Sequence, residues 1–247
     1  MHPSAFLTSR NSFVLFVATF LLTGTARSQS PAPAAGNAQG TQTFRAGLKS
    51  IAIPSPSSDL SEIGPDYRVL LETLAPTTNR LIAAIIRPED LHQILTGGDT
   101  PLTRSALVEA PRRAEFVEVD GATYKTVADA FAQQFGATLD GTIKSSEDDL
   151  NRKLKELNPE QASITLDKPL PLGTFFSKPD AASFGVVMSV SAKGPATKMV
   201  AAIGIVRAQN RILFLYVSSV YKDDASVRWV RETSERWADA VLAANKQ

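Results

Sequence analysis

The chain contains no cysteine among its 247 residues. Disulfide bonds are therefore excluded, and so is the lipoprotein type of signal, which needs a cysteine at its cleavage point. A protein without disulfides depends on an ordinary hydrophobic core for its stability. The hydrophobic content of 43% is normal for a globular protein, so the composition permits such a core.

A strong net charge is also lacking. The chain has 26 basic and 25 acidic side chains, and residues 1–28 hold two of the basic ones and no acid. The remainder therefore carries 24 basic groups against 25 acidic groups. Nucleic-acid-binding proteins concentrate a basic excess, and strong electrostatic attachment to anionic lipid needs one too. We expect neither kind of partner.

The N-terminal residues have the three parts of a secretory signal peptide. Arg10 precedes a short apolar run over residues 13–22, and small residues follow it. The run is shorter than the roughly 20 apolar residues that cross a bilayer as a helix. We expect cleavage after Ala26 or Ser28, no membrane span afterwards, and a soluble protein that is periplasmic or secreted. An uncleaved signal anchor is the alternative.

Composition divides the chain into three expected parts. Residues 1–28 are the signal peptide, and residues 29–43 form a disordered linker rich in Pro, Ala, Gly and Gln. Residues 44–247 form a single α+β domain. We find no internal repeat that would suggest a further division.

Hydrophobic periodicity predicts the elements of this domain. In the first half we expect one strand from Phe44 to Ile53, then helices that begin at Pro65 and Pro88. Central strands are expected over residues 81–86 and 105–110. Two helices should follow, the first over residues 124–135 with its end at Gly136, the second beginning at Ser146 in a capping-box pattern with Asp149.

The last third predicts a meander followed by a helix. Four strand-like runs are separated by short turns, which indicates antiparallel neighbours. Both faces of the run over 211–221 are apolar, so both should be covered. The fold class is therefore an antiparallel sheet with helices on both faces and a C-terminal amphipathic helix over residues 225–245. The four strands are expected at 174–177, 184–192, 198–207 and 211–221.

The segment from Met199 to Asn245 resembles the Mog1/PsbP-like proteins. It reads MVAAIGIVRAQNRILFLYVSSVYKDDASVRWVRETSERWADAVLAAN: a strand, a tight turn, a strand that ends near a Tyr, an acidic helix start, and a Trp inside the helix. The resemblance implies an antiparallel sheet flanked by helices and a non-enzymatic domain that binds a protein partner. It carries over no functional residue, because members of the group bind different partners.

Catalytic and metal-binding patterns are scarce. His92 is the single histidine after the signal peptide, and one histidine without cysteine makes a zinc site improbable. The pair Ser219 and Lys222 has the S-x-x-K spacing, but a strand end would point the two side chains to opposite faces. The acids at 147–149 and 223–224 suit helix starts. We therefore expect no catalytic residue, no metal and no cofactor.

Trp229 is the candidate for a binding site. It lies roughly 140° from the centre of the apolar stripe of the C-terminal helix, so it should face away from the sheet. Arg228 and Arg236 lie near it, and an exposed Trp with Arg neighbours is typical of an interface hot spot. The alternative is that a loop or the N-terminal segment covers the ring. The stripe consists of Val227, Val230, Ser234, Trp237, Val241 and Leu242.

Three functions remain open, and the residues favour the first. It is a non-catalytic domain that binds a protein partner in the cell envelope or outside the cell. The second is a hydrolase-type enzyme that uses carboxylates or hydroxyls, which would need a pocket with convergent polar groups. The third is a carrier of a small apolar ligand held between the sheet and the helices. Its lining would come from Phe131, Phe135, Phe175, Phe176 and Phe184.

Overall fold

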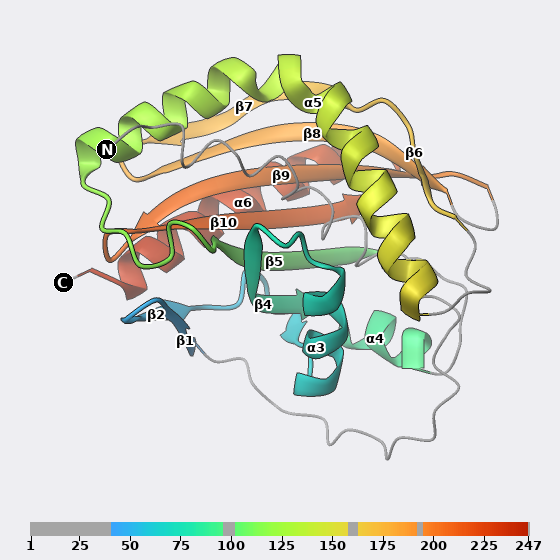
Figure 1. The fold of residues 1–247 in the computed structure, drawn as a ribbon, viewed down its shortest axis with the longest axis horizontal. Coiled ribbons are helices and arrows are strands. Elements are labelled where there is room, and N and C mark those ends of the chain that lie inside the picture. The colour runs from blue at the N-terminus through green and yellow to red at the C-terminus, as the bar shows by residue number, and fades with distance from the viewer. Residues whose placement is uncertain (1–40, 96–101, 158–162, 192–194, 247) are drawn as a thin grey trace.

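The computed structural model describes residues 41–95, 102–157, 163–191 and 195–246. The expected signal peptide and most of the expected linker lie outside these ranges. The described chain is organised around an eight-stranded sheet in the order β3-β4-β5-β10-β9-β8-β6, with β7 also paired to β8 (Figure 1). The strands are β3 Ser61–Glu62, β4 Asn79–Ile86, β5 Arg104–Pro111, β6 Thr165–Leu166, β7 Leu170–Lys178, β8 Ala181–Ser191, β9 Thr197–Ala208 and β10 Arg211–Val220.

The expected meander is confirmed. Strands β7, β8, β9 and β10 pair in sequence, and each pair is antiparallel. The β9–β10 turn consists of Gln209 and Asn210, whose φ angles are 48° and 59°. Positive φ at both positions is the two-residue hairpin turn that matches strand twist. Strand β5 then pairs with β10, so the two halves of the chain meet in the centre of the sheet.

Helices cover both faces of the sheet, as expected for the α+β class (Figure 1). On one face, α3 (Pro65–Leu74) packs against β4, and α5 (Gly121–Leu157) shares a core cluster with Ile212, Phe214 and Tyr216 of β10. On the other face, α6 (Asp224–Ala244) packs against the alternate residues of β10, which begin at Leu213. The short helix α4 (Pro88–Leu95) follows β4. No helix within the described ranges combines the length and apolarity needed to span a membrane.

The expected single strand from Phe44 to Ile53 is wrong. The segment forms a separate hairpin of β1 (Gln42–Ala46) and β2 (Lys49–Ile53), which packs on the α6 face. Gly47 makes the reversal possible because its φ of 61° lies in the left-handed region. Leu48, within the segment predicted as one strand, is 75% exposed at the tip of the hairpin.

The two helices expected on either side of Gly136 and Ser146 are a single helix, α5, of 37 residues, which bends near its middle (Figure 1). Ser146 is fully buried inside it and caps nothing. Glu147 accepts a hydrogen bond from the backbone N–H of Leu166 at 2.7 Å. It therefore joins α5 to β6 and does not act at a helix start. The capping-box prediction failed because burial of the continuous apolar stripe of α5 outweighs the local cap signal.

The C-terminal helix agrees with its prediction. Asp223 is the N-cap of α6, and its carboxylate accepts hydrogen bonds from the backbone N–H groups of Ala225 and Ser226. Val230, Trp237 and Val241 are buried against the sheet. The acidic pair at 223–224 therefore begins with a structural cap, as the sequence indicated.

Candidate interaction surfaces

The residues considered for catalysis do not converge. His92 is exposed on α4. Ser219 donates its hydroxyl to the carbonyl oxygen of Val220 at 3.2 Å, while Lys222 is exposed. Among the described residues, no group of His, Asp and Glu could hold a metal ion. Ser219, the candidate nucleophile of the described chain, therefore has a backbone carbonyl rather than a base as its hydroxyl's partner.

Glu109 is the most strongly perturbed acid, and it lies in the core. It is fully buried on β5, on the α5 face of the sheet. The side-chain amide of Asn79 donates to its carboxyl at 2.5 Å, and the hydroxyl of Tyr216 lies 3.4 Å away. Burial raises the pKa of Glu109 to about 8, against the lowering effect of these two hydrogen bonds. At neutral pH the group is therefore mostly protonated and acts as a core hydrogen-bonding group.

A small pocket in the described part of the chain lies elsewhere. It opens between the β1–β2 hairpin and β4, lined in part by Phe44, Ser55 and Glu62. Its enclosed space has room for no more than about a single water molecule, far below the size of a small-molecule site. Glu109 and His92 are not in its lining.

The phenylalanines considered for a ligand carrier divide between the two faces of the sheet. Phe131, Phe135 and Phe184 pack together under α5, with ring centroids 5.2–5.7 Å apart. Phe175 and Phe176 belong to the opposite core cluster, under α6. The first three form ordinary aromatic packing, and the five residues do not line one common space.

Trp229 is half-buried rather than fully exposed. The guanidinium of Arg104, from the start of β5, lies over its ring at 4.2 Å from the centroid. Arg104 also bonds Asp59 at 2.9 Å. Part of the cover therefore comes from this strand residue, and the ring also packs against the core cluster on the α6 face, so it does not face away from the sheet as predicted. Sequence reasoning did not identify Arg104, because it lies 125 positions before Trp229 in the chain.

A second aromatic–cation pair lies at the same corner. The ammonium of Lys198 is 4.7 Å from the ring centroid of Tyr221, just after β10. In the antiparallel pairing of β5 with β10, Arg104 lies opposite Ser219. Ser219 is two residues before Tyr221 in the chain. We call the set Arg104, Lys198, Tyr221 and Trp229 the aromatic corner. It is half-exposed and lies at the N-terminal end of α6.

The two arginines predicted to accompany Trp229 are separated along α6. Arg228 is exposed beside the aromatic corner and forms no ion pair among the described residues. Arg236 lies two turns further on, also exposed, at 3.8 Å from Glu232 and 3.4 Å from the hydroxyl of Thr233. Arg228 is thus the chain neighbour of Trp229 on α6, and Arg236 lies on another part of the helix.

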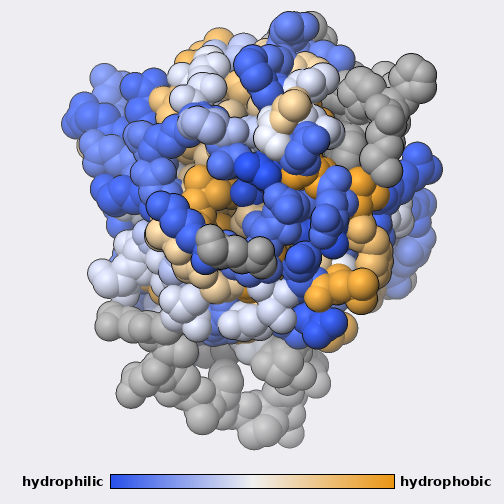
Figure 2. Space-filling model, turned by 90° about the vertical axis from the view of Figure 1, so that its left-hand side faces the viewer, coloured by the Kyte–Doolittle hydropathy of each residue, from blue (hydrophilic) through white to orange (hydrophobic). Residues whose placement is uncertain are grey.

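A second exposed surface lies near the hairpin, at the opposite end of α6 from the aromatic corner. Leu48 at the tip is 75% exposed, and Phe116, in the turn after β5, is 66% exposed. Gly47 packs directly on the backbone of Glu115 and Phe116. Figure 2 shows apolar patches among hydrophilic residues at this end of the molecule. The sequence prediction missed this surface because an isolated Phe and Leu look like core residues.

Comparison with known proteins gives only a likeness of fold. No family model and no curated sequence match the chain. Among solved structures, the chain is similar to the Ran-binding protein Mog1p of Saccharomyces cerevisiae, with a TM-score of 0.29 and 12% sequence identity, over 83% of this chain and 93% of that one. This agrees with the weak resemblance to the Mog1/PsbP-like proteins seen in the sequence. A likeness of this size carries no argument about function, which must come from the residues.

Proposed function

We propose that this protein is an exported, non-catalytic domain that binds a protein partner through the aromatic corner and Arg228. The observation that carries the proposal is the half-exposed Trp229 ring beneath Arg104, beside an exposed arginine. Trp, Tyr and Arg are the residues most enriched at energetic hot spots of protein interfaces. Trp229 and Tyr221 are each stacked with a cation here, so binding would order these two rings little further.

The position of the corner supports this proposal. Trp229 is anchored on α6 next to the buried Val230, and Arg104 is fixed by its ion pair with Asp59. A partner could stack against the guanidinium face that does not contact Trp229, because Arg stacks on aromatic rings as well as forming ion pairs. Arg236 would contribute only if the interface extended along α6 by two turns.

The test is a binding measurement on the mature domain. The wild-type protein is immobilised and exposed to the envelope fraction of its own cells, beside a Trp229→Ala variant whose fold is checked by circular dichroism. We expect a specific protein to be retained by the wild type and lost with the variant, and the isolated partner to bind with an affinity reduced at least about tenfold.

The matched control is His92→Ala, an exposed substitution on α4 that should retain the partner. Retention of every partner by a folded Trp229→Ala protein would contradict the aromatic corner as the binding surface. Retention of no protein by the wild type would contradict the binding proposal itself.

Export is proposed on the signal-peptide pattern and is tested separately. A fusion of residues 1–43 to alkaline phosphatase, which is active only after export, should give activity outside the cytoplasm. Mass spectrometry of the exported protein should place its N-terminus after Ala26 or Ser28. Inactive fusions with an intact N-terminus would contradict this part of the proposal.

A further inference from the structure

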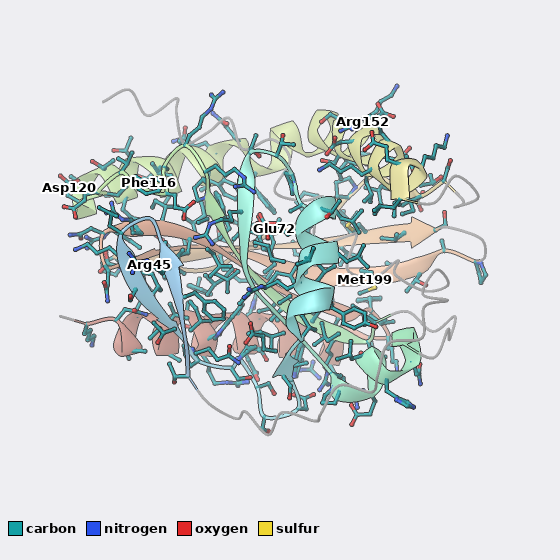
Figure 3. All side chains as sticks on the ribbon, turned by 60° about the horizontal axis from the view of Figure 1, so that its bottom comes forward. Arg45, Glu72, Phe116, Asp120, Arg152 and Met199 are labelled. Atoms are coloured by element: carbon teal, nitrogen blue, oxygen red, sulfur yellow. The ribbon has the colours of Figure 1, made fainter. Side chains whose placement is uncertain are left out.

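The hairpin end of the molecule carries a surface that the aromatic corner does not explain. Leu48 and Phe116 are two of the most exposed large hydrophobic side chains in the described chain. They come from segments about 70 positions apart, and the close packing of Gly47 on Phe116 brings them together. Figure 3 shows Phe116 and Arg45 at this end of the molecule. We call Leu48, Phe116, Arg45 and Arg113 the hairpin-tip surface.

The backbone beneath this surface is held by a partly buried group of hydrogen bonds centred on Glu115 and Arg80. The carboxylate of Glu115 accepts hydrogen bonds from the backbone N–H of Gly47 at 3.0 Å and from Nε of Arg80 at 3.0 Å. Arg80 also donates to the backbone carbonyl of Arg45. The hairpin and the turn after β5 are therefore locked to each other. A rigid pair of exposed apolar side chains loses little entropy on binding.

The acidic and basic side chains near Leu48 and Phe116 differ in whether they have an ion-pair partner. Glu115 is neutralised by Arg80, and Glu118 lies 3.8 Å from both Lys49 and Arg211. Arg45 and Arg113 are exposed, and neither has an ion pair within the described parts of the chain. Glu115 and Glu118 thus have cationic partners, and two exposed arginines, one on β1 and one in the turn after β5, have no acidic partner among the described residues.

We propose that the hairpin-tip surface binds an acidic segment of a partner protein that carries a bulky apolar side chain. The apolar side chain would pack against Leu48 and Phe116, and the acidic groups would pair with Arg45 and Arg113. Arginine suits this role because its planar fork binds carboxylates through two parallel hydrogen bonds. The inference is independent of the aromatic corner, which lies at the other end of α6.

A protein segment fits this surface better than a membrane or a second copy of the chain. Two apolar side chains bury too little area for stable membrane attachment, which normally takes a whole amphipathic face or a lipid chain. The near-zero net charge of the mature chain adds no general attraction to anionic lipid. A symmetric dimer at this point would bring the unpaired arginines of two copies together, which is unfavourable.

The experiment uses the mature domain and an array of short labelled peptides. Each peptide places Phe, Leu or Trp among Asp and Glu residues, at every spacing. Matched peptides replace the acids by Ser or the apolar residue by Ser. We expect binding only where both features are present. The Phe116→Ser and Arg113→Glu variants should each weaken binding by about tenfold or more, and added salt should weaken it further.

Matched controls separate this surface from general effects. Leu170→Ser removes a side chain that is 61% exposed on β7, and Lys155→Glu reverses an exposed charge on α5. Both should bind the peptides as the wild type does, and so should Trp229→Ala. If Trp229→Ala alone abolished binding, the peptides would occupy the aromatic corner, and the hairpin-tip proposal would be wrong.

Three other outcomes would also overturn it. The first is failure of every acidic peptide to bind the folded wild type. The second is sedimentation with anionic lipid vesicles that Phe116→Ser abolishes, which would assign the surface to membranes. The third is a concentration-dependent dimer, seen by light scattering, that the same substitution dissociates.

Discussion

At the residue scale, Glu109 shows how the core tolerates an acid. Its side chain is fully buried on β5. Oε2 accepts a hydrogen bond from the side-chain amide of Asn79 and lies 3.4 Å from the hydroxyl of Tyr216, while Oε1 has no hydrogen-bond partner. Loss of hydration on burial is the main cause of the raised pKa of Glu109, and no charged group contributes to it. Such a residue is protonated in the folded protein at pH values where the unfolded chain is ionised.

The stability of the protein should therefore depend on pH through Glu109. The folded-state pKa of about 8 lies above the ordinary value of 4.5. The stabilising contribution is complete below pH 4.5 and is lost as the pH rises through 8. Urea denaturation should show a free energy of unfolding that falls by up to about 1.4 kcal/mol per pH unit between pH 5 and 8. Glu109→Gln should remove most of this slope.

The control for Glu109 is Glu232→Gln, an exposed substitution on α6 that should leave the slope unchanged. A His92→Ala background, which changes an exposed side chain on α4, should keep the dependence. An unchanged slope in Glu109→Gln would show that the carboxyl is ionised in the folded state.

Gly47 gives a second prediction at this scale. A Cβ at this position would lie 2.4 Å from the carbonyl oxygen of Glu115, and the φ of 61° disfavours any side chain. We expect Gly47→Ala to reduce the free energy of unfolding by about 1–3 kcal/mol, measured in urea. The matched change Gly64→Ala adds a Cβ that meets nothing within 4 Å, at a φ of −61°, and should cost much less. Equal losses in the two variants would contradict the packing described at Gly47.

At the element scale, the local sequence predicted most of the fold. The continuous apolar runs over β8, β9 and β10 are bounded by turn residues, and the helical stripe of α6 is long and regular, so their types and approximate limits followed from the sequence pattern. Gly47 was missed as a turn because Phe44 and Ile53 suggested one continuous strand. The division of α5 was wrong because Gly136 and Ser146 carry local stop and start signals that burial against the sheet overrides.

Ser146 makes the α5 correction testable. As an N-cap, Ser146 would stabilise a helix, and its removal would cost about 1 kcal/mol. Inside α5 its hydroxyl is buried without a hydrogen-bond partner, and Ala has the higher helix propensity. We therefore expect Ser146→Ala to raise the free energy of unfolding, by on the order of 1 kcal/mol. Asp223→Ala, at the true cap of α6, should lower it. Destabilisation by Ser146→Ala would restore the capping interpretation.

The candidate surfaces were less accessible to sequence reasoning than the elements. Periodicity predicted that Trp229 faces away from the sheet, but the half-buried ring packs against the core on the α6 face and stacks with Arg104. That stack depends on strand pairing between distant segments. The hairpin-tip surface depends on the packing of Gly47 against the turn after β5, and no local sequence pattern predicts this contact. Both surfaces are products of tertiary contact, so only the structure could assemble them.

At the scale of the whole molecule, Asn245 ties the end of α6 to the first hairpin. Its side chain accepts from the N–H of Ala52 at 2.9 Å and donates to the C=O of Ala52 at 2.7 Å. We expect Asn245→Ala to cost about 1–3 kcal/mol and to speed hydrogen exchange along β2. Lys246→Ala, one position later and exposed, should do neither. Normal protection of β2 in Asn245→Ala would mean that Trp237 and the core alone hold the hairpin.

The pairing of β5 with β10 has a consequence for how the chain acquires its structure during synthesis. About 100 residues separate the two strands, so a ribosome must make nearly the whole protein before the centre of the sheet can close. Closing so long a loop is slow compared with forming local helices. The growing polypeptide would remain open for much of its synthesis. A secretion channel that admits only unfolded polypeptide could transport such a chain without first having to unfold it.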